Sequence, residues 1–197
     1  MFIEQAFKAK TEWWRYLIGL VIIFFAWQLL GAIPLFAALF IETGPEILTL
    51  TQAEMMKVLD SNLNFFLLLL TFAVGLAGLF FVIKFLHNQK IKDATTTRKK
   101  VDWGRFFFGF SIVAVFTVIT VIVDYNLQPQ DYLWNFDMVP FLILAAIALI
   151  MVPLQTSFEE YLFRGYLMQG IGVLAGNKWL PLVITSVIFG GMHILNP

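Results

Sequence analysis

Five long apolar runs restrict what this chain can fold into. They cover residues 16–41, 63–86, 106–123, 139–154 and 179–195. Each is close to the roughly 20 apolar residues that a helix needs to cross the core of a bilayer. With 13% charged residues, the chain carries about half the charge of an average soluble domain. The runs predict an all-α fold, a polytopic transmembrane helix bundle with about five spans, in a single domain over residues 1–197.

Lysine and arginine in the connecting segments predict the orientation, because these residues stay on the cytoplasmic side of a membrane. Three precede the first run and seven lie within 84–105, whereas 124–138 contains none. We therefore expect a cytoplasmic N-terminus in an integral membrane protein of a bacterial cell membrane. The basic segment would meet anionic lipid headgroups in the bilayer, and no nucleic acid is expected as a partner. His87, at the end of the second run, is expected at the membrane interface.

Two local patterns predict element boundaries. Thr51-Gln-Ala-Glu54 has the spacing of a capping box and predicts a short helix through about Leu59. Residues 139–170 read as one helix that only two prolines interrupt. Pro140 suits a helix start, and Pro153 is expected to kink the helix shortly before its charged end.

Three charges follow the fourth apolar run, in the stretch SFEEYLFRGYL at 157–167. Glu160 and Arg164 are spaced i, i+4 and can pair on one face of a helix. Glu159 points about 100° away from Glu160 by the helical period, so its carboxylate is left free for chemistry. The alternative is a cluster of snorkelling charges at the membrane interface, and charge content alone does not decide between the two.

A histidine lies deep in the fifth run. His193 follows mostly apolar residues and is costly there unless it has a partner. Helix rise places His193 roughly 21 Å and Glu159 roughly 15 Å from the inner ends of their helices, so their depths are similar. Phe189 shares the face of His193 and would support it, and Gly190 and Gly191 would permit close helix approach. A lone buried histidine more often hydrogen-bonds a neighbouring helix, but the glutamate at similar depth favours a shared site.

The stretches EEYLFRGYL and FGGMH resemble the first two motifs of the CPBP family of intramembrane proteases, also called the Abi or CAAX-protease family. The resemblance covers about 139–197, and the family includes the CAAX prenyl endopeptidase and bacteriocin-processing or immunity proteins. It implies that Glu159 and His193 activate the attacking water, and that Glu160 and Arg164 fill the other charged positions of the first motif. It also implies a membrane-associated peptide or protein as substrate.

The chemistry of peptide hydrolysis suits these residue types. A carboxylate in a low-dielectric cavity is a stronger base than one in water. His193 could orient the water as a neutral imidazole, or bind a divalent metal such as zinc with Glu159 as a second ligand, and the sequence leaves both open. The chain has no cysteine, no His-Glu-x-x-His and no Gly-x-Ser-x-Gly. The competing function is a non-catalytic membrane protein that binds a partner, of the bacteriocin self-immunity type.

The family also has a third motif on a later helix, a histidine followed four residues on by asparagine or aspartate. Residues 1–197 do not contain it. We expect the coding sequence to continue beyond Pro197 into at least one more span that carries this motif. Asn196, three residues after His193, is expected to end the fifth helix and not to take that role.

Overall fold

The computed structural model describes residues 2–194, and every regular element in that part of the chain is a helix. The α-helices are α1 (Trp13–Phe24), α2 (Ile33–Thr43), α3 (Gln52–Val58), α4 (Ser61–Phe81), α5 (Ile91–Thr95), α6 (Trp103–Leu127), α7 (Met138–Glu160), α8 (Met168–Ala175) and α9 (Trp179–His193). Three π-helical segments, η2 (Phe25–Leu30), η4 (Val82–Leu86) and η6 (Tyr161–Leu167), continue α1, α4 and α7. Three short 3₁₀ segments are η1 (Ile3–Lys8), η3 (Gly44–Thr49) and η5 (Pro129–Asp131). The predicted all-α class is confirmed.

Four helical stretches within the described residues are long and apolar enough to cross a bilayer. They are Trp13–Thr49, Ser61–Leu86, Trp103–Leu127 and Met138–Ala175. The fifth run forms α9, a shorter apolar helix of 15 residues. The predicted polytopic transmembrane bundle is therefore confirmed, with four full-length candidates and one shorter helix. The expectation for Asn196 falls outside the described residues.

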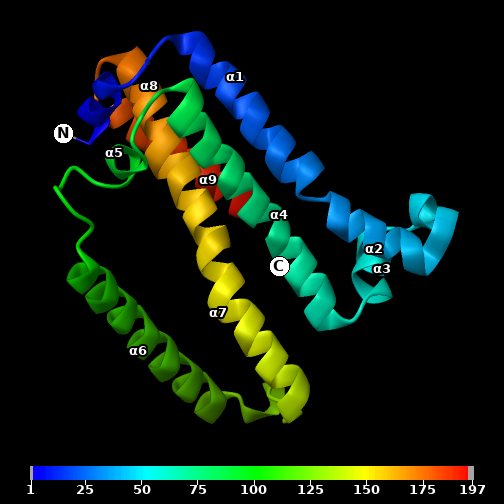
Figure 1. Cartoon of the computed structure of the whole chain (residues 1–197). Coiled ribbons are helices and arrows are strands. Elements are labelled where there is room, and N and C mark those ends of the chain that lie inside the picture. Colours follow the sequence, from blue (N-terminus) through cyan, green and yellow to red (C-terminus); the bar gives the residue numbers. More distant parts are fainter. Residues whose placement is uncertain (1, 195–197) are drawn as a thin grey trace.

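The centre of the bundle is the crossing of α4 and α7, and α1 lies along α4 (Figure 1). Helix α8 lies at one end, and α9 runs from that end toward the middle of the bundle. Gly75 on α4 permits this approach, because a Cβ atom there would lie 3.0 Å from both the Phe158 ring and Trp27 Cβ. The buried core at the crossing consists of Ile23, Leu76, Leu79, Val82, Ile83, Ala94, Phe158, Leu162, Phe163 and Tyr166. It surrounds the junction of α7 and η6, where the first motif lies.

The connecting segments gather at the two ends as the charge pattern requires. The Lys10 backbone N–H donates to the His87 carbonyl over 2.9 Å, so the N-terminal segment meets the segment after the second span. At the opposite end, the Asn62 side chain donates to the Pro140 carbonyl over 3.0 Å. The two segments that are predicted to be cytoplasmic thus share one end of the bundle. Which end faces the cytoplasm stays a prediction.

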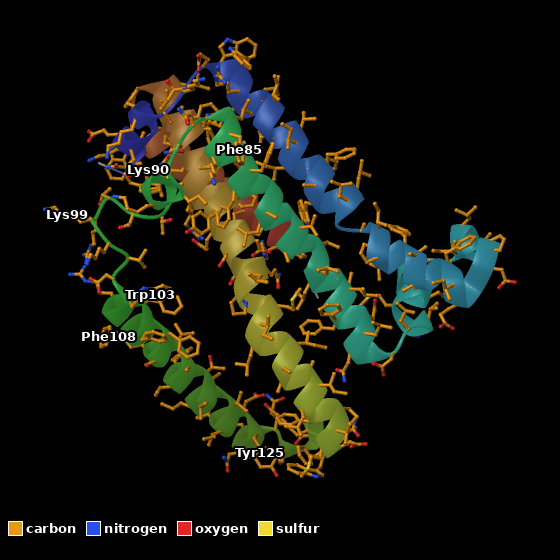
Figure 2. All side chains as sticks on the ribbon, viewed as in Figure 1. Phe85, Lys90, Lys99, Trp103, Phe108 and Tyr125 are labelled. Atoms are coloured by element: carbon orange, nitrogen blue, oxygen red, sulfur yellow. The ribbon has the colours of Figure 1, made fainter. Side chains whose placement is uncertain are left out.

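Helix α6 stands apart from the bundle, and none of its residues is buried (Figure 1). Its aromatic side chains, among them Phe108 and Tyr125, project from an isolated helix (Figure 2). Apolar surface of this extent is unfavourable in water but not in the hydrocarbon of a bilayer. The exposure of α6 is therefore consistent with a transmembrane helix.

Three local expectations can be compared with the structure directly. Thr51 caps α3 with the predicted capping box, in which Glu54 bonds back to the Thr51 backbone N–H at 2.8 Å. The single helix over 139–170 is confirmed, because Met138–Ala175 is one helical stretch, although it changes from the α-helix α7 to the π-helix η6 after Glu160. No residue pattern in the sequence marks that change. Pro153 lies inside α7, as predicted.

The interfacial position of His87 stays a prediction, but the residue is buried within the protein. Its side chain is 2% exposed and lies among Tyr16 and Tyr166, with ring centroids 4.5 and 5.3 Å away. The polar ring can be buried because both of its nitrogens hydrogen-bond groups from distant parts of the chain.

Candidate active site

Glu159 is the penultimate residue of α7 and is half-buried. The Gln155 side chain, one helical turn earlier, donates from Nε2 to Glu159 Oε1 over 3.4 Å. Such a donor stabilises the charged carboxylate and restricts its rotamer. Gln155 was not predicted as a site residue, although it is a polar residue four positions before Glu159 in an apolar run.

His193 is the last residue of α9, and its ring is fixed by its own helix. The Nδ1 atom lies 2.8 Å from the Phe189 carbonyl oxygen. Because a carbonyl only accepts, Nδ1 carries the hydrogen, and the neutral ring leaves the Nε2 lone pair available. The ring also packs on that of Phe189, with 4.4 Å between centroids. His193 thus presents one basic nitrogen with a defined orientation.

The structure brings Glu159 and His193 together in the lining of one cavity of about 320 Å³. Its volume lies within the range of about 300–1,000 Å³ that is typical of ligand pockets. The other lining residues are Trp27, Phe72, Gln155, Phe158, Leu162, Phe163, Phe189 and Met192. A mostly apolar cavity with a carboxylate and an imidazole is suited to water activation, because few other polar groups compete for the water.

Glu160 and Arg164 lie on another side of the helix. They form the i, i+4 ion pair that the spacing predicts, and about half of each side chain is exposed. The Arg164 guanidinium also lies over the Phe189 ring, with 5.2 Å from Cζ to the ring centroid. Both charged residues line a different cavity of about 310 Å³, together with Thr95 and Tyr161. Of the two, Arg164 contacts the candidate site, through Phe189.

Two aromatic residues from earlier spans complete the cavity, and the sequence analysis missed both. Trp27 and Phe72 pack with ring centroids 5.3 Å apart, and each packs on Phe158, the residue before Glu159. They also line a second cavity of about 470 Å³ between α2, α3 and α4, which has no charged lining residue. One signal was present, since Trp27 is the only tryptophan far from the ends of the apolar runs.

The predicted role of the glycine pair before His193 is not supported. A Cβ atom built at Gly190 or Gly191 would have no atom of another described element within 4 Å. Phe189 of α9 contacts η6 instead, with its ring centroid 5.2 Å from that of Phe163.

The donor set bears on whether a metal ion fits. Among residues 2–194, no group of three or more His, Cys, Asp or Glu side chains is placed to hold a metal ion. Catalytic zinc sites use three protein ligands, and this cavity offers one carboxylate and one imidazole nitrogen. The described residues alone therefore do not fit a zinc site.

Comparison with known proteins supports the motif assignment. Residues 138–197 match the family described as "Type II CAAX prenyl endopeptidase Rce1-like". The chain is 29% identical over 192 residues to the uncharacterized protein YyaK of Bacillus subtilis (strain 168). The aligned region covers 96% of this chain and 64% of the length of YyaK. No solved structure matches the chain. Over residues 138–197 this integral membrane protein thus matches the Rce1-like CAAX-protease family, and the resemblance predicted from its two motifs is confirmed.

Proposed function

We propose that this chain carries the water-activating residues of an intramembrane endopeptidase that cleaves a membrane-associated peptide or protein. The observation that carries the proposal is the shared cavity, in which Glu159 at the end of α7 and His193 at the end of α9 line the same 320 Å³ space. Both residues lie inside the segment that matches the protease family.

The reaction can be written with these two residues and one water. The Glu159 carboxylate removes a proton from the water while the water oxygen attacks the carbonyl carbon of the scissile bond. His193 Nε2 accepts a hydrogen bond from the other O–H of that water and thereby orients it. The carbon–nitrogen bond then breaks, and the protonated Glu159 returns its proton to the leaving nitrogen. Gln155 holds Glu159 in place, and the Phe189 carbonyl fixes the tautomer of His193.

The surrounding cavities indicate what kind of substrate segment would fit. The uncharged 470 Å³ cavity adjoins the site at Trp27 and Phe72, so it would accept apolar side chains next to the scissile bond. The Glu160–Arg164 pair lies over the 310 Å³ cavity at the end that holds the basic segments. An apolar peptide with a polar flank matches this arrangement.

The test uses the protein produced from its complete coding sequence, in proteoliposomes, with a library of membrane-associated peptides. We expect Glu159→Gln to lower cleavage by about 100- to 10,000-fold, the range for loss of a general base. The matched control is Glu42→Gln, which changes an exposed carboxylate at the far end of α2 and should leave cleavage unchanged. Membrane insertion is measured for both variants.

Two results would overturn the proposal. Cleavage by Glu159→Gln at the rate of the unchanged protein would reject the general-base role. Stable retention of a membrane partner that is never cleaved, by the unchanged protein and the variant alike, would support the non-catalytic immunity-type function.

A further inference from the structure

His87 joins three elements that are far apart in the sequence. Its Nδ1 lies 2.7 Å from the Lys10 carbonyl oxygen, and its Nε2 lies 3.0 Å from the Tyr166 hydroxyl. Since the carbonyl only accepts, Nδ1 carries the hydrogen. In a neutral ring Nε2 then has a lone pair, and the Tyr166 hydroxyl must donate to it. The second span is thereby tied to the N-terminal segment and to η6.

Tyr166 reaches this position through a gap in α1. A Cβ atom at Gly19 would overlap the Tyr166 hydroxyl and would lie 2.8 Å from Val82 Cγ1. The same hydroxyl lies 3.3 Å from the Tyr16 carbonyl oxygen and 3.4 Å from that of Arg15. The ring of Tyr166 is therefore enclosed between α1 and the end of the second span.

The segment that carries Tyr166 also carries contacts to the candidate site. Within η6, Phe163 packs on Phe189 and Arg164 lies over the same ring. Phe189 in turn packs on His193. A π-helix is less regular than an α-helix and occurs often at functional sites, so its register depends on contacts that hold it.

We propose that His87 and Tyr166 form a positioning pair for the Glu159–His193 cavity. Neutral His87 accepts a hydrogen bond from the Tyr166 hydroxyl and thereby keeps η6 in place, and protonation of His87 weakens this attachment of η6. The effect on catalysis rests on the proposed peptidase function, whereas the coupling between His87 and the cavity does not.

Protonation of His87 reverses the direction of its hydrogen bond with the Tyr166 hydroxyl and requires no new partner. The imidazolium donates from both nitrogens, so Tyr166 becomes an acceptor. Its single hydrogen then turns to the more distant carbonyl oxygens of Tyr16 and Arg15, at 3.3 and 3.4 Å. The bond between Nε2 and the Tyr166 hydroxyl is kept with its direction reversed, so the number of hydrogen bonds does not fall. The added charge is buried, however, and an opening that exposes His87 to water relieves its desolvation cost. Protonation therefore weakens the attachment of η6 through this buried charge.

Burial of His87 favours its neutral form. Burial lowers the pKa of His87, and the charge of Arg15 lowers that pKa further, while the bond to the Lys10 carbonyl and the charge of Glu12 raise it. Tyr16 and Tyr166 are the titratable rings packed against it. The switch from neutral to protonated His87 therefore falls below the ordinary histidine pKa of about 6.5.

The test exploits the two histidines of the chain. A background variant with Glu159→Gln and His193→Gln removes both titrating groups of the cavity and leaves His87 as the single histidine. The 197-residue chain is prepared in detergent micelles with ¹⁵N-labelled histidine and ¹³C-methyl-labelled methionine. The His87 ring signals are followed by NMR between pH 4 and 8, together with the methyl signal of Met192, which lines the cavity.

We expect the Nδ1–H tautomer at neutral pH, and a Met192 shift with the same midpoint as His87. Adding Tyr166→Phe should remove the Met192 response. Adding Tyr161→Phe should preserve it, because that hydroxyl, in the same segment, bonds Thr95 instead. A Met192 signal that ignores the His87 titration, or that follows it equally without the Tyr166 hydroxyl, would overturn the proposal. If Tyr166→Phe does not fold, the proposal is judged by whether the Met192 signal follows the His87 titration in the background variant.

Peptidase activity is measured separately on the unmodified protein. An inactive protein in which Met192 still follows His87 would reject the proposed function and keep the positioning pair. An active protein without this coupling would do the reverse.

Discussion

Arg164 and Phe189 connect the two motifs physically, with the guanidinium 5.2 Å above the ring centroid. Arg164 pairs with Glu160 on its other side, and Phe189 packs on His193 at 4.4 Å between centroids. The charged pair of the first motif therefore contacts the histidine of the second motif through one aromatic ring. Glu160 and Arg164 do not line the cavity that holds Glu159, and Arg164 contacts Phe189, which does.

This contact predicts that Arg164→Gln lowers the free energy of unfolding by about 0.5–1 kcal/mol, the value of a cation–π contact at a partly exposed site. Unfolding is measured by denaturant titration in mixed micelles. The control is Arg98→Gln, which breaks an i, i+4 pair with Asp102 and has no ring beneath it. Equal losses in the two variants would show that the Phe189 contact contributes nothing.

Gln155 is predicted to support Glu159 during cleavage. Gln155→Leu removes the 3.4 Å bond to the carboxylate. We expect about a tenfold lower kcat/KM, equivalent to about 1.4 kcal/mol and modest for a bond to a charged group. Thr156→Val is the control, because that hydroxyl bonds only backbone carbonyls of its own helix, those of Val152 and Pro153. A normal rate in Gln155→Leu would mean that Glu159 is positioned without it.

Much of the fold follows from local sequence. Apolar runs need only helix length and bilayer thickness to predict spans, and the capping box at Thr51 and Glu54 needs only neighbouring residues. The i, i+4 pair of Glu160 and Arg164 is local as well. These features are the ones that the structure reproduces.

Apart from Gln155, whose bond to Glu159 is local, the site and core features that were not predicted depend on contacts between distant elements. His87 is buried because Lys10 and Tyr166, 77 and 79 residues away, satisfy its ring. Trp27 and Phe72 become cavity walls through packing on Phe158. A hydropathy pattern reports how apolar a residue is but not which helix it meets, so such partners could not be predicted.

The orientation is tested by cysteines placed at the two ends of this cysteine-free chain. Thr97→Cys lies at the end that carries the basic segments, and Gln130→Cys lies in the segment without lysine or arginine. We expect a membrane-impermeant maleimide to label position 130 in intact cells and position 97 only after permeabilisation. The reverse pattern would place the N-terminus outside and reject a cytoplasmic substrate.

His87 predicts a specific pH dependence of stability. Its pKa is lowered in the folded protein, first by burial, so between the folded and unfolded pKa values the unfolded chain binds more protons. The His87 contribution to stability is therefore present above about pH 6.5 and is lost as the pH falls below that value. Glu12 and Glu54 also have lowered pKa values, but their protonation changes stability only at about pH 4 and below, outside the range in which His87 acts.

The measurement compares the unfolding free energy of the unchanged chain and of His87→Gln between pH 7.5 and 5. The unchanged chain should lose stability over this range, and the variant should show a flatter profile. Parallel profiles would mean that His87 titrates equally in both states, in conflict with its burial.

Gly19 provides the most direct test of how Tyr166 is seated. Gly19→Ala would put a methyl group onto the Tyr166 hydroxyl and against Val82, so the ring must leave its place between α1 and the second span. Overpacking of this kind costs about 1–3 kcal/mol. Gly109→Ala is the matched control, since a Cβ atom on α6 would have nothing within 4 Å and alanine favours the helix by up to about 1 kcal/mol. Denaturant titration should therefore show that the free energy of unfolding falls in Gly19→Ala and rises or stays unchanged in Gly109→Ala.

The His87 NMR signals should also shift in Gly19→Ala and not in Gly109→Ala, because only the first variant displaces the Tyr166 hydroxyl from Nε2. Unchanged His87 signals in Gly19→Ala would show that Tyr166 does not occupy this gap in the membrane-embedded protein.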